Sequence, residues 1–272
     1  MEKIVNNVAN QLTQLGVDNP EIAIILGSGL ANIAESIEDK IVIPFNKIEG
    51  MPITNVKGHK NQFIYGKING KKVLAMQGRF HLYDGFTAKQ VCLPIYVFKK
   101  LGIKTTIITN ASGSLNESIG VGSIMMITDH INFTGQNALI GGAILDFGEQ
   151  FIDMSEPYSL RLQNIAVNVA KQSNIELKKG IYAQVMGPMY ETTAQSKMLN
   201  ICGCDAVGMS TVIEVECAVQ CNMQVLGLSV ITDMALKSDN IKTSHEEILE
   251  QSKLSSLKLK EIIYNFIKNI NE

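Results

Sequence analysis

Short segments of apolar or β-branched residues alternate with amphipathic segments along this chain, and this alternation limits the possible folds more than any other feature. Residues 21–26 (EIAIIL) and 104–109 (KTTIIT) are the clearest strands, and residues 3–15 and 87–101 carry apolar residues at helical spacing. A nearly continuous apolar strand is typical of a parallel sheet that helices cover on each side. We therefore predict an α/β fold with a mixed, mostly parallel central β-sheet flanked by α-helices on both faces.

Elements of the same two kinds continue through the rest of the chain. Further strands are expected at residues 41–43, 62–65, 72–76, 123–127, 180–185 and 224–231. Further helices are expected at residues 158–173, 193–201, 212–221 and 244–267. No repeat, low-complexity tract or Pro/Ser-rich linker interrupts them, and 46% of the 272 residues are hydrophobic. Such a chain can bury one large core, so we predict one domain spanning residues 1–272.

Charge and composition exclude several functional classes. The net charge is −2 and the charges are interspersed, so no basic surface is expected to attract nucleic acid or an anionic membrane. Residues 1–16 show helical spacing instead of the unbroken apolar run of a signal peptide or membrane span, so we expect a cytoplasmic protein. The five cysteines show no zinc-type pairing and the four histidines form no ligand motif, so no metal is predicted. A small molecule is the expected partner.

Four segments that follow predicted strands contain glycine or small polar residues. They are residues 26–30 (LGSGL), 77–85 (QGRFHLYDG), 109–116 (TNASGSLN) and 230–234 (VITDM). In open α/β sheets the ligand binds beyond the carboxyl ends of the strands. We therefore predict that these four segments together form the functional site.

The second of these segments places three large polar side chains at alternate positions. Arg79, His81 and Tyr83 would share one side of an extended chain. The guanidinium of Arg79 matches phosphate oxygens, and the glycines beside Ser28 and in residues 110–113 allow backbone N–H groups to approach an anion. An arginine paired on the surface, a buried histidine and an ordinary turn would each be common alone. Their combination points to an oxyanion site.

Longer ordered blocks of sequence carry a resemblance to a known family. They are ILGSGL, VKGHKNQFIYG, MQGRFHLYDG, TNASGSLN, DHINFTGQN, MGPMYET, DAVGMSTVIEVECA and SHEEIL. Together they make nearly the whole chain resemble the trimeric, inosine-guanosine type of purine nucleoside phosphorylase, in the nucleoside phosphorylase type I superfamily. The resemblance implies reversible phosphorolysis of purine ribonucleosides or deoxyribonucleosides to the free base and a pentose 1-phosphate. Inorganic phosphate would be the co-substrate and nucleophile, with no cofactor.

The same resemblance implies a role for individual residues. Phosphate is expected to contact Ser28, Arg79, His81, the Ala111 backbone and Ser210, with His59 gating or ordering the site. The nucleoside is expected to contact Tyr83, Tyr190, Glu191, Val207, Met209, Asp233 and His245. Within these sets His81, Glu191 and Asp233 are the expected catalytic residues. Phe147 is expected to enter the site of a neighbouring subunit in a homotrimer.

Asp233 departs from the pattern of members specific for 6-oxopurines, which generally carry asparagine at this position. An ionised carboxylate accepts hydrogen bonds only, so it suits the 6-amino group of adenine, whereas a protonated one can donate to N7. Glu191 suits the N1–H of a 6-oxopurine instead. We therefore expect a purine nucleoside phosphorylase whose base range is broadened towards adenosine.

Other functions remain open at this point. A 5′-methylthioadenosine phosphorylase also has aspartate at the position of Asp233, although His245 suits a nucleoside 5′-hydroxyl group. A non-catalytic protein that binds a nucleoside or phosphate would use the same loops. A dinucleotide enzyme fits less well, because the segment GSGLAN lacks the third glycine of the G-x-G-x-x-G motif.

Overall fold

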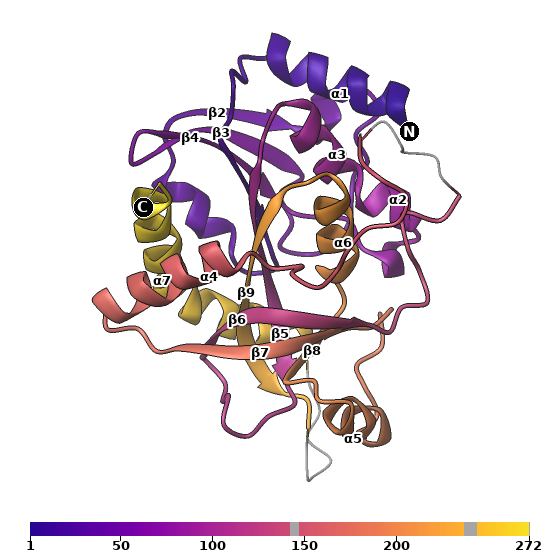
Figure 1. Ribbon diagram of the computed structural model, residues 1–272, viewed down its shortest axis with the longest axis vertical. Coiled ribbons are helices and arrows are strands. Elements are labelled where there is room, and N and C mark those ends of the chain that lie inside the picture. Colours follow the sequence, from indigo (N-terminus) through magenta and orange to yellow (C-terminus); the bar gives the residue numbers. More distant parts are fainter. Residues whose placement is uncertain (142–146, 237–243, 272) are drawn as a thin grey trace.

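The computed structural model describes residues 1–141, 147–236 and 244–271, and their strands form one mixed β-sheet (Figure 1). The strand order is β2-β3-β4-β1-β5-β8-β7-β6-β9, with an additional pairing between β5 and β9. The strands are β1 (Ile22–Leu26), β2 (Glu38–Pro44), β3 (Gln62–Ile68), β4 (Lys71–Gln77), β5 (Thr105–Ser114), β6 (Ile124–Asn132), β7 (Leu177–Gln184), β8 (Ala206–Gly208) and β9 (Gln224–Met234).

The central strands are parallel and buried on both faces. Every residue of β1 is buried, and β1 pairs in parallel with β4 on one side and with β5 on the other. Pairings of β2 with β3, β3 with β4, β5 with β8 and β6 with β9 are antiparallel. The predicted mixed sheet with a parallel centre is therefore confirmed.

One half of the sheet closes on itself, which the open-sheet expectation did not include. Strand β5 pairs with both β8 and β9, and the pairings β8 to β7, β7 to β6 and β6 to β9 complete a ring of five strands. Closure removes the free edges of these strands. The end of β5 consequently lies beside both β8 and β9, so that loops from distant parts of the sequence meet there.

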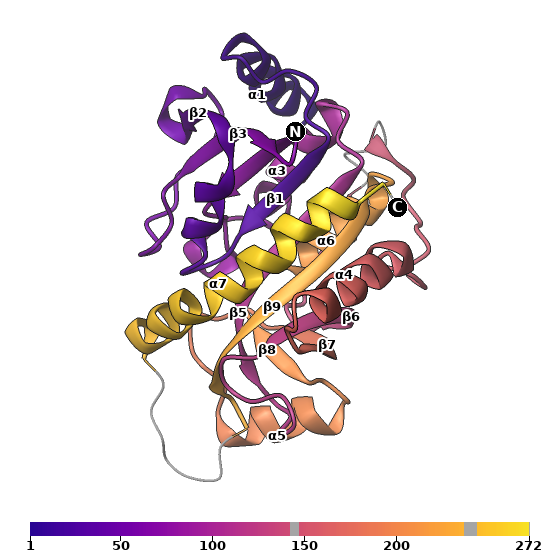
Figure 2. The ribbon, with the colours of Figure 1, turned by 90° about the vertical axis from the view of Figure 1, so that its left-hand side faces the viewer.

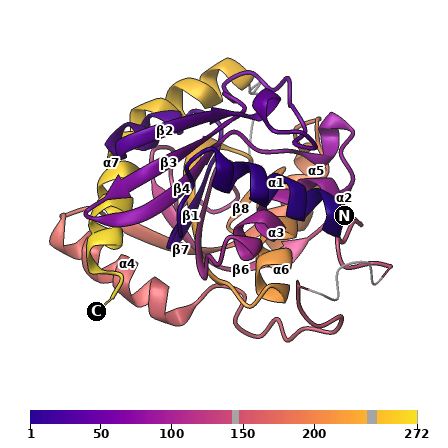
Figure 3. The ribbon, with the colours of Figure 1, turned by 90° about the horizontal axis from the view of Figure 1, so that it is seen from above.

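Helices cover both faces of the sheet, as predicted. Helices α1 (Glu2–Gln14), α3 (Leu93–Lys100) and α6 (Val212–Gln220) contribute to one apolar cluster, and α4 (Leu160–Gln172) and α7 (His245–Asn269) contribute to another. Figures 2 and 3 show these two groups on opposite sides of the central strands. The short helix α2 (Ala88–Val91) precedes α3, and α5 (Thr193–Ile201) lies beyond the strands of the closed half.

The structure departs from the predicted elements in four places. The helix expected at residues 87–101 is divided into α2 and α3 at Cys92. Strand β5 continues through the residues TNASGS, and β9 continues to Met234, where loops were expected. Strand β8 was not predicted, because three residues carry no periodic signal. In the described residues no helix combines the length and apolar character needed to span a membrane.

Candidate active site

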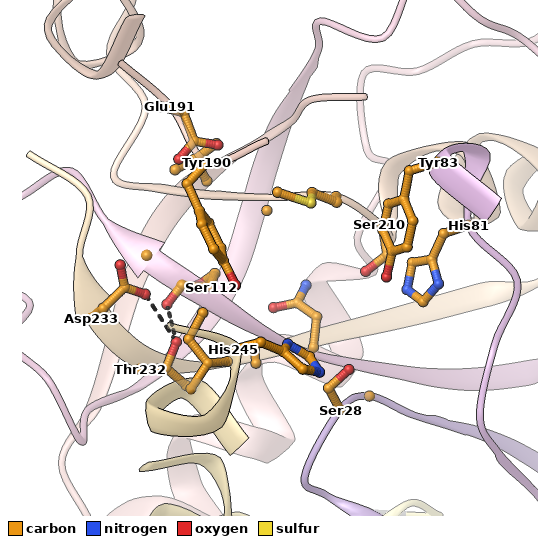
Figure 4. Close-up of a pocket in the computed structure, with 18 of the residues that line it drawn as sticks. Ser28, His81, Tyr83, Ser112, Tyr190, Glu191, Ser210, Thr232, Asp233 and His245 are labelled. Atoms are coloured by element: carbon orange, nitrogen blue, oxygen red, sulfur yellow. Dashed lines mark hydrogen bonds between the residues drawn. The ribbon is translucent and has the colours of Figure 1, made fainter. Parts of the chain in front are cut away.

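A cavity opens where β1, β5, β8 and β9 end, and most of the predicted site residues line it (Figure 4). The predicted residues in its lining are Ser28, Arg79, His81, Tyr83, Ala111, Tyr190, Glu191, Val207, Met209, Ser210, Asp233 and His245. His59 and Phe147 are not in the lining. Asn110, Ser112, Thr232 and Ile248 also line the cavity. Asn110 and Ser112 belong to a segment that was predicted to bind an anion, whereas Thr232 and Ile248 were assigned no individual role.

Successive side chains of residues 79–83 alternate between the apolar core and the cavity. Phe80 and Leu82 are 1% and 8% exposed and join the apolar core, whereas Arg79, His81 and Tyr83 line the cavity. The chain is extended at His81 and then forms a short 3₁₀ helix, η3 (Leu82–Asp84). As a result the rings of His81 and Tyr83 stack, with centroids 4.5 Å apart and planes 13° apart. The row of polar side chains therefore faces the cavity as one surface.

Arg79 is held within its own chain on several sides. Its side chain is 1% exposed, and one terminal nitrogen donates to Ser210 Oγ at 2.9 Å. The same nitrogen contacts Thr211 Oγ1 at 3.2 Å and Glu214 Oε2 at 3.1 Å, while the other terminal nitrogen donates to the Thr109 carbonyl. The guanidinium is thus fixed at the edge of the cavity before any ligand arrives. Fixed donors of this kind suit an oxyanion, because they need no rearrangement to bind it.

Thr211 and Glu214 take part in this arrangement, although the sequence analysis assigned them no role. Thr211 has φ of +90°, which is a strained conformation for a β-branched residue and is typical of functional sites. The Thr211 N–H donates to Glu214 Oε2 at 3.0 Å, forming the capping box that begins α6. Within the motif GMSTVIE, the spacing T-x-x-E is the signal from which this helix start could have been predicted.

His59 lies behind the cavity wall and orders Ser28. Its Nε2 is 3.3 Å from Ser28 Oγ, and its Nδ1 is 3.2 Å from the backbone nitrogen of Arg79. Burial, helped by the nearby His81 and Arg79, lowers the pKa of His59 to about 3, so the ring is neutral near pH 7. A neutral ring either accepts from the Arg79 N–H through Nδ1 and donates to Ser28 through Nε2, or donates from Nδ1 to the Arg79 carbonyl oxygen, 3.1 Å away, and accepts from Ser28.

His81 is also buried, and its environment favours the neutral form. Burial lowers the pKa of His81, and the carboxylate of Asp84 partly opposes that shift. Nδ1 of His81 is 3.4 Å from Asp84 Oδ2, which in turn accepts from Thr54 Oγ1 at 2.9 Å. The stack of His59, His81 and Tyr83 therefore brings hydrogen-bonding groups to the cavity without adding a full positive charge.

A buried hydrogen-bonded network forms the floor of the cavity. Asn110 Nδ2 donates to Thr211 Oγ1 at 2.8 Å, and its Oδ1 accepts from Ser229 Oγ at 2.6 Å. Ser229 Oγ also lies 2.6 Å from Ser112 Oγ. Gly27 contacts this floor directly, because a Cβ there would come within 2.8 Å of the Asn110 Cα atom. The two predicted small-residue segments, around Ser28 and in residues 109–114, therefore lie in contact. Residues 109–114, however, belong to strand β5 and not to a loop.

Carboxyl groups mark the opposite end of the cavity (Figure 4). Burial raises the pKa of Glu191, and the negative charge of Asp233 raises it further. Thr232 Oγ1 lies 3.1 Å from Asp233 Oδ1 and 3.2 Å from the Ser112 carbonyl oxygen. Tyr190 stands between these carboxyl groups and the rest of the cavity in Figure 4. The cavity therefore has a donor-rich end around Arg79 and an acidic end around Glu191.

Phe147, which was expected to enter the site of a neighbouring subunit, is buried in its own chain. This side chain is only 8% exposed and packs in the core of its own chain, with its ring centroid 5.2 Å from that of Tyr96. Phe151, four residues later, is 87% exposed. The sequence did not distinguish these two phenylalanines because both lie in an irregular segment without periodicity.

Comparison with known proteins agrees with this geometry. The model of the phosphorylase superfamily matches residues 21–268. The chain is 42% identical to purine nucleoside phosphorylase 1 of Bacillus subtilis (strain 168) over 250 residues, which are 92% of each protein. A structure of Schistosoma mansoni purine nucleoside phosphorylase in complex with adenosine has a TM-score of 0.94 and 37% identity, covering 98% of this chain and 97% of that one. The complex of the S. mansoni enzyme with inosine has a TM-score of 0.92 and 38% identity, covering 98% and 96%. With its family and its fold both matched over almost its whole length, this chain belongs to the phosphorylase superfamily and, within it, to the purine nucleoside phosphorylases.

Proposed function

We propose that the cavity binds orthophosphate at the end formed by Ser28, Arg79 and Ser210 and a purine nucleoside with its base at the end formed by Glu191 and Asp233. A phosphate oxygen attacks C1′ of the sugar, and the C1′–N9 bond breaks with its electron pair going to the purine. The products are the free base and a pentose 1-phosphate. The observation that carries this proposal is the division of one cavity into a donor-rich end and an acidic end.

The donor-rich end suits a tetrahedral oxyanion. Ser28 and Ser210 offer hydroxyl groups, His81 offers a ring nitrogen and Arg79 offers the positive charge of its guanidinium. The neutral ring of His59 supports Ser28 from behind. In the reaction, the sugar carries transient positive charge, so a phosphate dianion held beside it acts both as nucleophile and as counter-charge. Tyr83, Met209 and His245, which also line the cavity, are assigned to the sugar.

The acidic end accounts for the choice of base. An ionised Glu191 accepts from the N1–H of hypoxanthine or guanine, whereas adenine N1 requires a donor. Because burial and Asp233 raise the pKa of Glu191, its protonated form is more accessible than that of an exposed glutamate and can donate to adenine N1. Asp233 then accepts from the 6-amino group. The complex of a relative with adenosine supports the proposal that this enzyme's range includes adenosine.

A coupled assay tests this function. Purified enzyme is given inosine, and release of hypoxanthine is followed with and without orthophosphate. We expect turnover that requires phosphate and yields ribose 1-phosphate in equal amount. Base release that does not depend on phosphate would contradict the proposal, and binding without any release would favour the non-catalytic alternative. The same assay with 5′-methylthioadenosine distinguishes the related phosphorylase, which would use that substrate in preference to inosine.

We further propose that the active form is a homotrimer in which Phe151, not Phe147, closes the site of a neighbouring copy. Phe151 is 87% exposed, and the nearby Ile140 is 70% exposed. Met189 beside Tyr190 is 79% exposed, so an apolar surface also borders the cavity that would receive it. Large apolar side chains exposed at this level are typical of surfaces that associate.

A further inference from the structure

Glu214 lies outside the lining of the cavity, yet it is paired with Arg79, the residue proposed to hold the phosphate. It lies in the first turn of α6, is 1% exposed and does not line the cavity. One of its oxygens, Oε2, accepts from the Arg79 guanidinium at 3.1 Å and from the Thr211 backbone at 3.0 Å. The ion pair between Arg79 and Glu214 is buried on both sides.

The geometry of Arg79 does not depend on this carboxylate alone. Three neutral acceptors also hold the guanidinium: the Thr109 carbonyl oxygen, Ser210 Oγ and Thr211 Oγ1. Burial raises the pKa of Glu214, whereas the Arg79 guanidinium and the Thr211 N–H oppose that shift by stabilising the carboxylate. With the guanidinium 3.1 Å away, Glu214 is the partner that brings negative charge to Arg79, which the three neutral acceptors do not. Charges interact strongly in a buried environment, so an anion that enters the cavity meets the combined field of the arginine and its partner. The effective positive charge that it meets is therefore much smaller than that of an unpaired arginine.

We propose that Glu214 is the resident counter-ion of Arg79 and that, acting through Arg79, it limits the affinity of the site for phosphate. This inference rests on the proposed function, because it takes the donor-rich end as the phosphate site. Two consequences follow from the pairing. The empty enzyme avoids a buried arginine without a counter-charge, which would destabilise the fold. The pentose 1-phosphate product, whose phosphate group occupies the same place, can leave without the full attraction of an unpaired arginine.

The variant Glu214→Gln tests the charge while keeping the size of the side chain and an oxygen that can accept from the Thr211 N–H. With inosine saturating, we expect the KM for phosphate to fall about fivefold or more, because the negative charge of Glu214 no longer offsets the attraction between Arg79 and the anion. We expect kcat to fall as well, since the product leaves more slowly. The KM for inosine at saturating phosphate should stay within about twofold of wild type, because the base end is unchanged.

Glu216→Gln is the matched control. Glu216 lies on the same helix and is half-buried, and its carboxylate accepts from Asn132 and not from Arg79. A general loosening of α6 would affect both variants alike. We expect the Glu216→Gln enzyme to keep both KM values within about twofold of wild type.

Thermal unfolding gives a second readout that needs no nucleoside. In phosphate-free buffer the Tm of Glu214→Gln should lie below that of wild type, and orthophosphate should raise it by more than it raises the wild-type Tm, because the bound anion replaces the lost counter-charge. If Glu214→Gln folds only when phosphate is present throughout purification, that dependence supports the proposal. Glu214→Asp keeps the charge one methylene farther away, so its KM for phosphate should fall less.

A folded Glu214→Gln enzyme whose KM for phosphate is unchanged or higher would overturn the inference, because Glu214 would then serve only to position Arg79. This result is distinguishable from failure of the proposed function. If wild type itself releases no hypoxanthine in response to phosphate, the proposed function fails. If wild type turns over normally and only the variant disagrees, the counter-ion role alone is rejected.

Discussion

At the scale of single residues, the cavity is built from groups whose charge is set by their neighbours. Burial keeps His59 and His81 neutral, and Arg79 is paired with a buried carboxylate. Glu191 is pushed in the opposite direction, towards its protonated form, by burial and by Asp233. Groups with shifted pKa values gather at functional sites because catalysis needs particular protonation states. The two ends of this cavity therefore differ in chemistry more than the residue types alone indicate.

Asp233 is the residue that we propose to distinguish amino from oxo groups on the purine. In Asp233→Asn, the amide can donate to O6 of hypoxanthine and no carboxylate remains to accept from adenine. We expect kcat/KM for adenosine to fall by about tenfold or more, which corresponds to loss of one hydrogen bond to a charged group, and kcat/KM for inosine to be maintained or raised. Steady-state kinetics with both nucleosides measures this. Negligible adenosine activity that the substitution does not alter would refute the broadened base range.

The preference between bases should also depend on pH. The pKa of Glu191 is raised, so its protonated form increases as the pH falls from neutral towards that pKa. Protonated Glu191 donates to adenine N1 but cannot accept from the N1–H of hypoxanthine. The ratio of kcat/KM for adenosine to that for inosine should therefore rise as the pH is lowered. Taking the ratio at each pH cancels the titration of phosphate and of His59 and His81, and a flat ratio would argue against this role of Glu191.

At the scale of elements, the site depends on close contact between β1 and β5. Strand β1 ends at Leu26, and Gly27 then passes directly over Asn110 in β5. Glycine is required there because a methyl group would meet the Asn110 Cα atom at 2.8 Å and the Thr109 carbonyl oxygen at 2.9 Å. Ser28, the next residue, thereby lines the same cavity as Ala111 and Ser210. Thr109 of β5 also accepts from Arg79, which follows the other neighbour of β1, strand β4.

Gly27→Ala should therefore separate these two strands locally. We expect a loss of about 1–3 kcal/mol in the free energy of unfolding from overpacking, together with a KM for phosphate raised by about tenfold or more. Gly120→Ala is the control, because a Cβ at Gly120 meets no heavy atom within 4 Å. That substitution should change the unfolding free energy by less than about 0.5 kcal/mol. Denaturant unfolding and phosphate kinetics measure both variants, and equal behaviour of the two would contradict the packing argument.

At the scale of the whole molecule, closure of five strands into a ring gathers the cavity from distant parts of the sequence. The ring places the ends of β5, β8 and β9 together, and α7 adds His245 and Ile248 from the far end of the chain. Exposed apolar side chains lie outside this framework, Phe151 most of all. An assembly that covers such a side chain contributes to stability and excludes water from the site.

The two phenylalanines of residues 147–151 should respond differently to truncation. Phe147→Ala removes a buried ring that packs on Tyr96, so the unfolding free energy should fall by about 3 kcal/mol. Phe151→Ala should instead lower kcat/KM for inosine by about tenfold or more and shift the mass seen in analytical ultracentrifugation towards the monomer. Wild-type mass and kinetics in Phe151→Ala would exclude its proposed role in a neighbouring site.

Local patterns in the sequence were enough for the fold class, most of the elements and most of the cavity lining. Apolar runs such as residues 22–26 imply buried parallel strands, and the alternation of Arg79, His81 and Tyr83 implies one polar face, because both follow from backbone geometry over a few residues. The family motifs supplied Glu191, Ser210 and Asp233. Each of these features can be recognised without knowing where distant segments lie.

Only the tertiary structure decided how distant segments meet. Closure of the sheet through the pairing of β5 with β9, the burial of Phe147 and the ion pair between Arg79 and Glu214 all join residues far apart in the chain. Pairings of this kind depend on the packing of the whole molecule, and they leave no local periodicity in the sequence. The residues that we propose to bear the chemistry were therefore visible in the sequence, whereas the charge and exposure of those residues depend on contacts that form only when the chain folds.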